Sequence, residues 1–567
     1  MIPAVTAGSQ PVAELGRAAN NERSLPASGR TLAYAVVLMV ILAAGLKLTF
    51  GLENVFDVPL TDDTQYLRQG VELTEKGLPP ADWAPLYVAW FHALSYLQPD
   101  RLKLFYLNTK LLMVMLPVAF AVLLIRLRVH PLAVLALTTL CMISCGNAPG
   151  VPKVGAWGAI AVLCAFACPG WSAPAKALPV AASGALLASL VRPEFVYAFW
   201  LLLLVYAVVL ALEWRARRLG WGDASAVAAL ALFVLLVGLT VGLPGRGGPE
   251  DRVFYAFGQH FAWNYSKWQS LNHNFWTEWT SIVKTAFGDV HSVGDAWRAN
   301  PELFLKHVSS NARALLPAIC NLLSPKFIQL LPRLTVFQSD EGLIFAGAFL
   351  IYVVLARKAW SRGLRERLRA HWPLLATAAA FTAPSLVSAL LIAPEIWYLL
   401  PPCLVWLAVL AWVFCRGDPA ARMRPAAMLA PTALALALVP CVWGYYAGPS
   451  GRMPPCENVS TIASLRALKT AGDVNLLTTW VGMPVYTGDR VRLVSAWDKQ
   501  VGFAQFLEQR HVGVILIDRD LKDDIRFRDD PEWLRFLADP AAFGFAVAPI
   551  PGTPRLLALR RDIAALQ

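Results

Sequence analysis

The feature that most constrains the fold is a series of long apolar runs separated by short charged segments. Each run has about 17 to 25 residues, the length that a helix needs to cross roughly 30 Å of hydrocarbon. The runs lack the alternation of apolar and polar residues that is typical of membrane β-strands. With 57% hydrophobic and 16% charged residues, the chain is also too apolar for an average soluble protein. The sequence therefore predicts a polytopic α-helical membrane protein.

The basic residues predict how these helices are oriented. Arginine and lysine gather in cytoplasmic loops, and the net charge of +12 is carried by arginines in short loops rather than by one basic face. This pattern argues against nucleic-acid binding. It predicts about eleven spans, with the N-terminus in the cytoplasm and the C-terminus outside. The predicted spans cover residues 32–50, 104–125, 131–145, 154–168, 177–191, 195–212, 224–243, 342–355, 373–392, a tenth run that ends at Arg416, and 426–446.

The predicted transmembrane module covers residues 32–446 and follows a disordered cytoplasmic tail, residues 1–31. Two outer loops within the module are long, at residues 51–103 and 245–340. Residues 447–567 have a different character, because strand signals at 474–477, 512–517 and 555–559 alternate with helix signals at 465–468, 503–509 and 531–537. We therefore expect a small extracytoplasmic α/β domain there.

The predicted α/β domain shows no sign of a catalytic or nucleotide site. It has neither a G-x-G-x-x-G motif nor a P-loop. Its acids Asp518, Asp520 and Asp523 follow a predicted strand, in the context of a solvated turn. We expect this domain to cover the cavity of the module or to bind an acceptor.

An acidic pair, Asp62-Asp63, stands just beyond the first apolar run. Two adjacent acids are most often part of a solvated turn, but isolated charges on one face of a polytopic membrane protein are more often functional. A carboxylate beside cations at a membrane surface suits a reaction between an alcohol and a lipid phosphate ester. The plain alternative is that polar residues simply populate outer loops. The charged features predicted on the same outer face are Asp62-Asp63, Lys153, Arg192-Pro193-Glu194, and Glu395 with Tyr398.

Three short motifs resemble those of a known superfamily. Asp62-Asp63-Thr64-Gln65-Tyr66 resembles the Asp-Glu-x-x-Tyr signature of GT-C glycosyltransferases, which use polyprenyl-phosphate sugars and include protein mannosyltransferases and lipid A aminoarabinose transferases. Pro85-Leu86-Tyr87 is similar to their Pro-Leu-Tyr element. Residues 395–401 are similar to their Glu-x-Arg-Tyr-x-x-Pro element, with Trp397 in place of the arginine. With the large loop, the span arrangement and the terminal domain, the resemblance covers nearly the whole chain.

The resemblance implies roles for individual residues. Asp62 would be the general base, and Asp63, where the family usually has Glu, would orient the acceptor or a partner side chain. Because Trp397 replaces an arginine, the donor phosphate would be held elsewhere, by Lys153 or Arg192. The remaining residues with an implied substrate-binding role are Tyr66, Tyr87, Glu194, Glu395 and Tyr398, followed by His260 and Arg252 in the large loop.

The implied activity is the inverting transfer of a sugar from a polyprenyl phosphate to a lipid, glycan or protein at the outer face of a bacterial inner membrane. Membrane lipids would surround the protein. No cofactor is predicted, and a divalent metal ion is not indicated. A transporter or flippase of lipid-linked sugars would need similar charges, and a non-catalytic envelope assembly factor is a third reading.

The nine cysteines are scattered, mostly within apolar runs, and form no Cys-x-x-Cys pair. Small apolar packing is their simplest role. Cys320 and Cys456 lie in the two long polar segments, so a disulfide between them is expected only if that side is oxidising.

Overall fold

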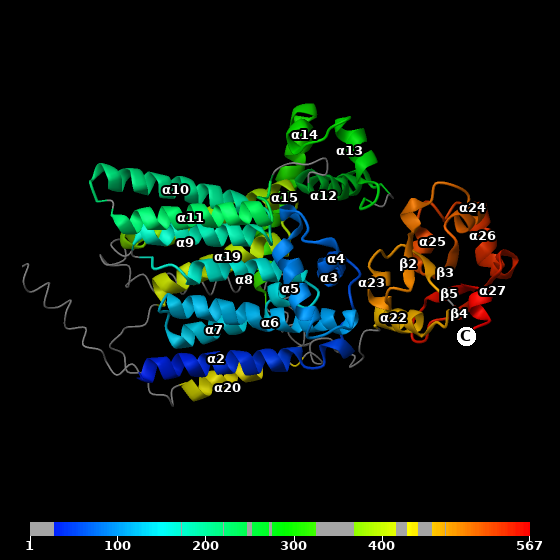
Figure 1. Cartoon of the computed structure of the whole chain (residues 1–567), viewed down its shortest axis with the longest axis horizontal. Coiled ribbons are helices and arrows are strands. Elements are labelled where there is room, and N and C mark those ends of the chain that lie inside the picture. The colour runs from blue at the N-terminus through cyan, green and yellow to red at the C-terminus, as the bar shows by residue number, and fades with distance from the viewer. Residues whose placement is uncertain are drawn as a thin grey trace, which may run out of the picture.

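The computed structural model describes residues 28–171, 173–218, 220–245, 252–271, 275–324, 368–415, 428–439, 441, 456–470 and 472–567. The molecule is elongated and mostly helical (Figure 1). Long helices form a bundle along most of its length, and the C-terminal region, which we define as the described residues 456–567, lies at one end.

Six helices in the described part of the chain are long and apolar enough to cross a membrane. This agrees with the predicted class of membrane protein. The bundle is also well packed, since α6 contacts α2, α8 and α19, while α18 contacts α10 and α19. The six helices are α2 (Ser28–Thr49), α6 (Arg101–Arg126), α10 (Phe195–Arg215), α11 (Trp221–Thr240), α18 (Trp372–Leu391) and α19 (Ile396–Phe414).

Other predicted spans are helical but shorter than the membrane is thick. The 13 residues of α7 (Pro131–Ile143) reach only about 20 Å at 1.5 Å per residue. The helices α8 (Lys153–Ala167) and α9 (Pro174–Ser189) have 15 and 16 residues. They pack closely, because a Cβ atom on Gly184 would lie only 2.4 Å from the Cβ atom of Ala165.

Part of the sequence prediction lies outside the described residues. This applies to the predicted tail up to residue 27 and to the predicted span 342–355. Within the predicted span 426–446, the structure describes α20 (Leu429–Leu438).

The first outer loop folds into short helices that rest on the bundle. They are η1 (Leu52–Asn54), α3 (Asp62–Val71), α4 (Leu73–Lys76), η2 (Ala81–Trp83) and α5 (Pro85–Ser95). The helices α3 and α5 approach each other at Gly70, where a Cβ atom would lie 2.5 Å from the Cβ atom of Phe91. We call residues 57–66, which include the acidic pair, the acidic segment.

The second long loop is also helical where the structure describes it. Its helices are α12 (Arg252–Gln269), α13 (Trp279–Phe287), α14 (Val293–Ala299) and α15 (Pro301–Leu323). They share an aromatic core that includes Phe257, Phe261 and Phe304. The helix α15 also contacts α18 and α19, so this loop is joined to the bundle.

The C-terminal region contains a five-stranded sheet with the order β2-β1-β3-β5-β4. Strands β1 (Val474–Thr478), β2 (Val491–Ser495) and β3 (Val512–Ile517) are parallel to one another. Strand β5 (Leu556–Arg560) is antiparallel to both of its neighbours, β3 and β4 (Phe545–Pro549). All six residues of β3 are buried, as expected for a central strand. The helices around the sheet are α22 (Glu457–Ala467), α23 (Met483–Thr487), α24 (Phe503–Gln509), α25 (Arg519–Asp523), α26 (Pro531–Ala538) and α27 (Arg561–Ala564).

The expected disulfide is not formed, because Cys320 and Cys456 are both free thiols. Their elements pack in different places. Cys320 is in α15, which ends beside η3 (Cys145–Asn147), whereas Cys456 directly precedes α22, which docks on Asp57.

Candidate functional site

The two acids of the acidic pair have opposite environments. Helix α3 begins at Asp62, so both carboxylates lie in its first turn, where the helix dipole favours negative charge. Successive residues of a helix point about 100° apart. As a result Asp62 is exposed, whereas Asp63 is only 5% exposed. In the described part of the chain, the Asp62 carboxylate forms no hydrogen bond or ion pair.

Asp63 is the centre of a buried hydrogen-bond network. Its Oδ2 accepts a hydrogen bond of 2.9 Å from the backbone N–H of Lys153, the first residue of α8, and its Oδ1 accepts one of 3.3 Å from the Tyr87 hydroxyl. That hydroxyl accepts a hydrogen bond from Asn108 Nδ2, and Asn108 Oδ1 accepts one from Trp90 Nε1. Burial raises the pKa of Asp63 to about 6. Asp63 therefore joins α3, α5, α6 and α8.

The Lys153 side chain does not form an ion pair with Asp63. It is 1% exposed, and its Nζ donates a 2.7 Å hydrogen bond to the carbonyl oxygen of Ala148 in the preceding turn. Only its backbone N–H contacts the acidic pair. In this arrangement the ammonium group is directed at the protein backbone.

Arg192, Glu194 and Tyr398 lie together, although the sequence paired Tyr398 with Glu395. Nε and Nη2 of Arg192 contact Oε1 of Glu194 at 2.8 and 2.7 Å, and its guanidinium lies 4.6 Å from the centroid of the Tyr398 ring. The arginine stem rests on α8 at Gly158, where a Cβ atom would lie 2.6 Å from its Cγ. Both charged side chains are largely buried, so this pair is a fixed part of the site.

Arg252 contacts the tyrosine of the acidic motif directly. Its Nη2 donates a 3.0 Å hydrogen bond to the Tyr66 hydroxyl, and its Nη1 donates one to the carbonyl oxygen of Asp82. The guanidinium also lies 4.9 Å from the centroid of the Trp83 ring. Tyr398 is within electrostatic range of both Arg192 and Arg252. The two arginines thus lie around the same group of tyrosines.

Helix α12 also reaches the exposed acid. Burial and, to a smaller extent, the negative charge of Asp62 raise the pKa of Tyr255, which lies one turn after the start of α12. The second outer loop is therefore within electrostatic range of Asp62. Tyr255 could not be predicted as a site residue from the sequence, because an isolated tyrosine in an aromatic-rich helix carries no distinguishing signal.

Glu395 and His260 lie farther from the acidic pair. Burial raises the pKa of Glu395, and the cation that interacts with it is Lys267, not a residue of the acidic segment. No described residue donates a hydrogen bond to the Glu395 carboxylate. His260 packs between the rings of Trp263 and Trp276, and burial lowers its pKa to about 4. It is therefore neutral at pH 7.

Trp397 serves as a packing residue. A Cβ atom on Gly155 of α8 would lie 2.6 Å from the Cβ atom of Trp397, so α8 and α19 touch at this point. The two helices that touch here carry Lys153 and Tyr398.

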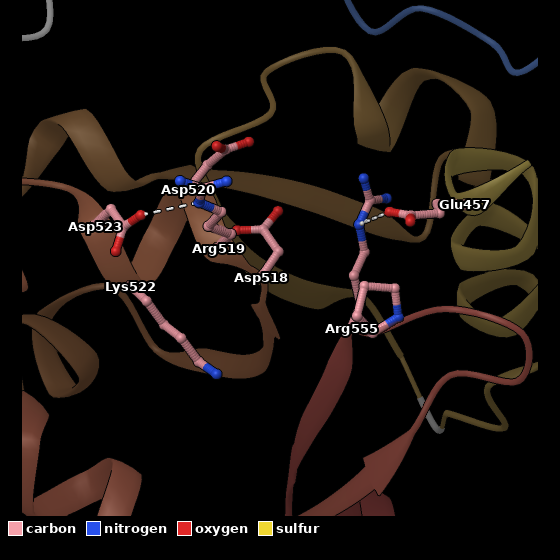
Figure 2. Close-up of a pocket in the computed structure, with 8 residues that line it drawn as sticks. Glu457, Asp518, Arg519, Asp520, Lys522, Asp523 and Arg555 are labelled. Carbon is pink, nitrogen blue, oxygen red and sulfur yellow. Dashed lines mark hydrogen bonds and ion pairs between the residues drawn. The ribbon is translucent and has the colours of Figure 1, made fainter. Parts of the chain in front are cut away.

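A second polar site lies in the C-terminal region, where a pocket of about 370 Å³ opens (Figure 2). It is at the carboxyl end of β3, beside Pro554 and Arg555, which lead into β5. Much of the charge on its walls is paired, with Arg519 on Asp523 and Arg555 on Glu457. The lining residues are Glu457, Asp518, Arg519, Asp520, Lys522, Asp523, Pro554 and Arg555.

The expectation of a solvated turn is wrong for one acid of this pocket. Asp520 and Asp523 are exposed, but Asp518 is only 7% exposed. Its carboxylate accepts hydrogen bonds from the indole of Trp480 and from the backbone N–H of Leu521, and burial raises its pKa. Asp518 lies between the central strand β3 and α25, where its side chain caps the helix.

Neither the protein-family models nor the curated proteins that were searched match this chain. Function is therefore inferred from the residues around the acidic pair.

Proposed function

We propose that this protein is an inverting glycosyltransferase that moves a sugar from a polyprenyl-phosphate donor to a lipid, glycan or protein acceptor. In this proposal the chain crosses a bacterial inner membrane about eleven times. The N-terminus is cytoplasmic, and the acidic segment and the C-terminal region, as a small α/β domain, lie in the periplasm.

The observation that carries the proposal is the difference between the two acids. A general base needs a basic oxygen that a substrate hydroxyl can reach. The Asp62 carboxylate is exposed and accepts no hydrogen bond from described residues, whereas both oxygens of Asp63 are already occupied. We therefore assign the base to Asp62 and the support of the site to Asp63.

The proposed reaction is a single displacement at the anomeric carbon. The acceptor hydroxyl gives its proton to Asp62 as its oxygen bonds to the anomeric carbon. The bond from that carbon to the phosphate oxygen breaks, and its electron pair leaves with polyprenyl phosphate. One displacement from the opposite face inverts the anomeric configuration.

Arg252 and Arg192 are the proposed partners of the leaving phosphate. Cations close to the developing negative charge lower the barrier to its departure, and arginine can hold two phosphate oxygens at once. Arg252 is the better candidate for binding the phosphate. Its contacts with described residues are two neutral oxygens and the Trp83 ring, none of which neutralises its positive charge. Arg192 is already neutralised by Glu194. Lys153 is not assigned to the phosphate, because its ammonium is buried on a backbone carbonyl.

The test is whether the purified protein releases polyprenyl phosphate. Membranes of a deletion strain supply both the native donor and the native acceptor, and we expect polyprenyl phosphate to appear only after the protein is added. A transporter would relocate the lipid-linked sugar between leaflets without this release, and that outcome would contradict the proposal.

A further inference from the structure

The C-terminal region is docked on the acidic segment. The Asp57 carboxylate accepts hydrogen bonds of 2.8 and 3.1 Å from the backbone N–H groups of Asn458 and Val459, at the start of α22. Asn458 Nδ2 in turn donates a 2.7 Å hydrogen bond to the carbonyl oxygen of Val58. Two consecutive residues of the acidic segment are thus fixed to the same helix.

The closest contact is between two backbones. A Cβ atom on Gly482 would lie 2.8 Å from the carbonyl oxygen of Leu60 and 3.1 Å from both its carbonyl carbon and its Cα. Backbone atoms cannot turn aside as a flexible side chain can, so this position requires glycine. A third contact follows at Thr64, whose hydroxyl lies 3.3 Å from the Tyr486 hydroxyl.

The far end of the first outer loop is held by the same region. Arg466, on α22, contacts Asp100 at 2.8 Å, and Arg101 contacts Asp489 at 2.7 Å. The pocket is connected to this interface as well. Arg555, which lines the pocket (Figure 2), donates a 2.7 Å hydrogen bond to Asn458 Oδ1.

We propose that the C-terminal region positions Asp62. Gly482, which contacts Leu60, is the principal positioning residue. The contacts made by Asp57 and Tyr486 hold the acidic segment on either side of Leu60. The inference rests on the proposed function of Asp62. The Asp62 side chain makes no hydrogen bond with described residues, so the backbone of the acidic segment sets where its carboxylate lies. The three contacts at Asp57, Leu60 and Thr64 bracket that residue in the sequence.

The sharpest test is Gly482→Ala, with Gly472→Ala as the matched control. Gly482 has φ −77° and ψ −17°, which alanine adopts freely, so only the contact with Leu60 opposes the change. A Cβ atom on Gly472 would meet nothing within 4 Å. A displacement of about 1 Å can reduce a rate a hundredfold. We expect kcat to fall at least about tenfold in Gly482→Ala, with KM for the deletion-strain lipid extract little changed, and no change in Gly472→Ala.

Hydrogen exchange of residues 57–71 provides a readout that needs no substrate. We expect faster exchange in Gly482→Ala and in Asp57→Ala than in Gly472→Ala, with partial recovery in Asp57→Asn, which keeps one acceptor oxygen. Tyr486→Phe removes only a hydroxyl, so it remains informative if Gly482→Ala does not fold, and we expect it to speed exchange near Thr64.

Two outcomes overturn the proposal. One is exchange in the acidic segment that is the same in Gly482→Ala, Asp57→Ala and Gly472→Ala, and the other is full activity of a folded Gly482→Ala protein. Failure of the proposed function would look different. The wild type would then release no polyprenyl phosphate, while hydrogen exchange would still report whether the C-terminal region holds the segment.

Discussion

At the scale of single residues, the two acids of the acidic pair have opposite environments. Asp63 is buried where four helices meet and accepts hydrogen bonds from Lys153 and Tyr87. Asp62 is exposed one position earlier and has no such partner among the described residues. The start of α3 between Thr61 and Asp62 produces this difference, because it fixes which acid turns toward the bundle.

The buried position of Asp63 predicts a pH-dependent contribution to stability. Its pKa rises from 3.8 to about 6 in the folded protein. A folded-state pKa above the unfolded value gives a contribution that is full below about pH 4 and is lost as pH rises through about 6. The corresponding loss in the free energy of unfolding is about 3 kcal/mol at most. We expect the thermal midpoint of the wild type to fall, relative to Asp63→Asn, between about pH 4.5 and 7. Asp62→Asn, at the exposed position, is the control, and its thermal midpoint should change with pH as that of the wild type does. A difference in midpoint between the wild type and Asp63→Asn that stays constant with pH would contradict a raised pKa of Asp63.

The sequence predicted the acidic pair as the site but not most of its partners. The link between Lys153 and Asp63 runs through a backbone N–H, which no residue type reveals. Arg252 and Tyr66 lie 186 positions apart in the chain, and only the fold brings them together. The grouping of Arg192 with Glu194 was readable because the two residues share one turn.

At the scale of elements, strongly patterned segments were predicted and weakly patterned ones were not. The predicted strand 512–517 and helix 503–509 match β3 and α24 residue for residue, because apolar residues fill β3 and recur at helical spacing in α24. The strands β2 and β4 were missed. Both are five-residue strands at the edges of the sheet, and each buries only one residue.

A buried polar contact between elements predicts a large loss of stability on mutation. Asn311 of α15 donates hydrogen bonds to the carbonyl oxygens of Leu390 and Ile392 at the end of α18. Asn311→Leu would leave both oxygens buried without a donor, which costs about 2 to 4 kcal/mol. We expect a clearly lower thermal midpoint than for Ala312→Leu, which adds the same side chain at the exposed neighbouring position. Equal midpoints for the two variants would show that this contact does not join α15 to α18.

At the scale of the whole molecule, the apolar core of the bundle extends into the C-terminal region. Val514 and Leu516 of β3 belong to the same cluster of buried residues as Leu60 and Tyr66. The class of membrane protein followed from the apolar runs alone. The docking of the C-terminal region did not, because it depends on Asp57, Gly482 and Tyr486, whose types are common at surfaces and turns.

The proposed topology predicts the location of the C-terminus. Basic inner loops and about eleven spans agree in placing it outside the cytoplasm. A reporter that is active only in the cytoplasm, fused after Gln567, should therefore stay inactive. The same reporter placed after Arg218, in a predicted inner loop, should be active and serves as the control. An active C-terminal fusion would mean that the span count is off by one.

The central claim is that Asp62 is the general base, and Asp62→Asn tests it most directly. Asparagine keeps the size and much of the hydrogen bonding of aspartate but removes the basic oxygen. A positioned base contributes a factor of about a hundred to ten thousand, so the release of polyprenyl phosphate should fall at least about a hundredfold. Expression and donor binding should be unchanged, and Glu75→Gln, at an exposed position in the same loop, should transfer normally. Near-normal release by Asp62→Asn at matched protein levels would contradict the account.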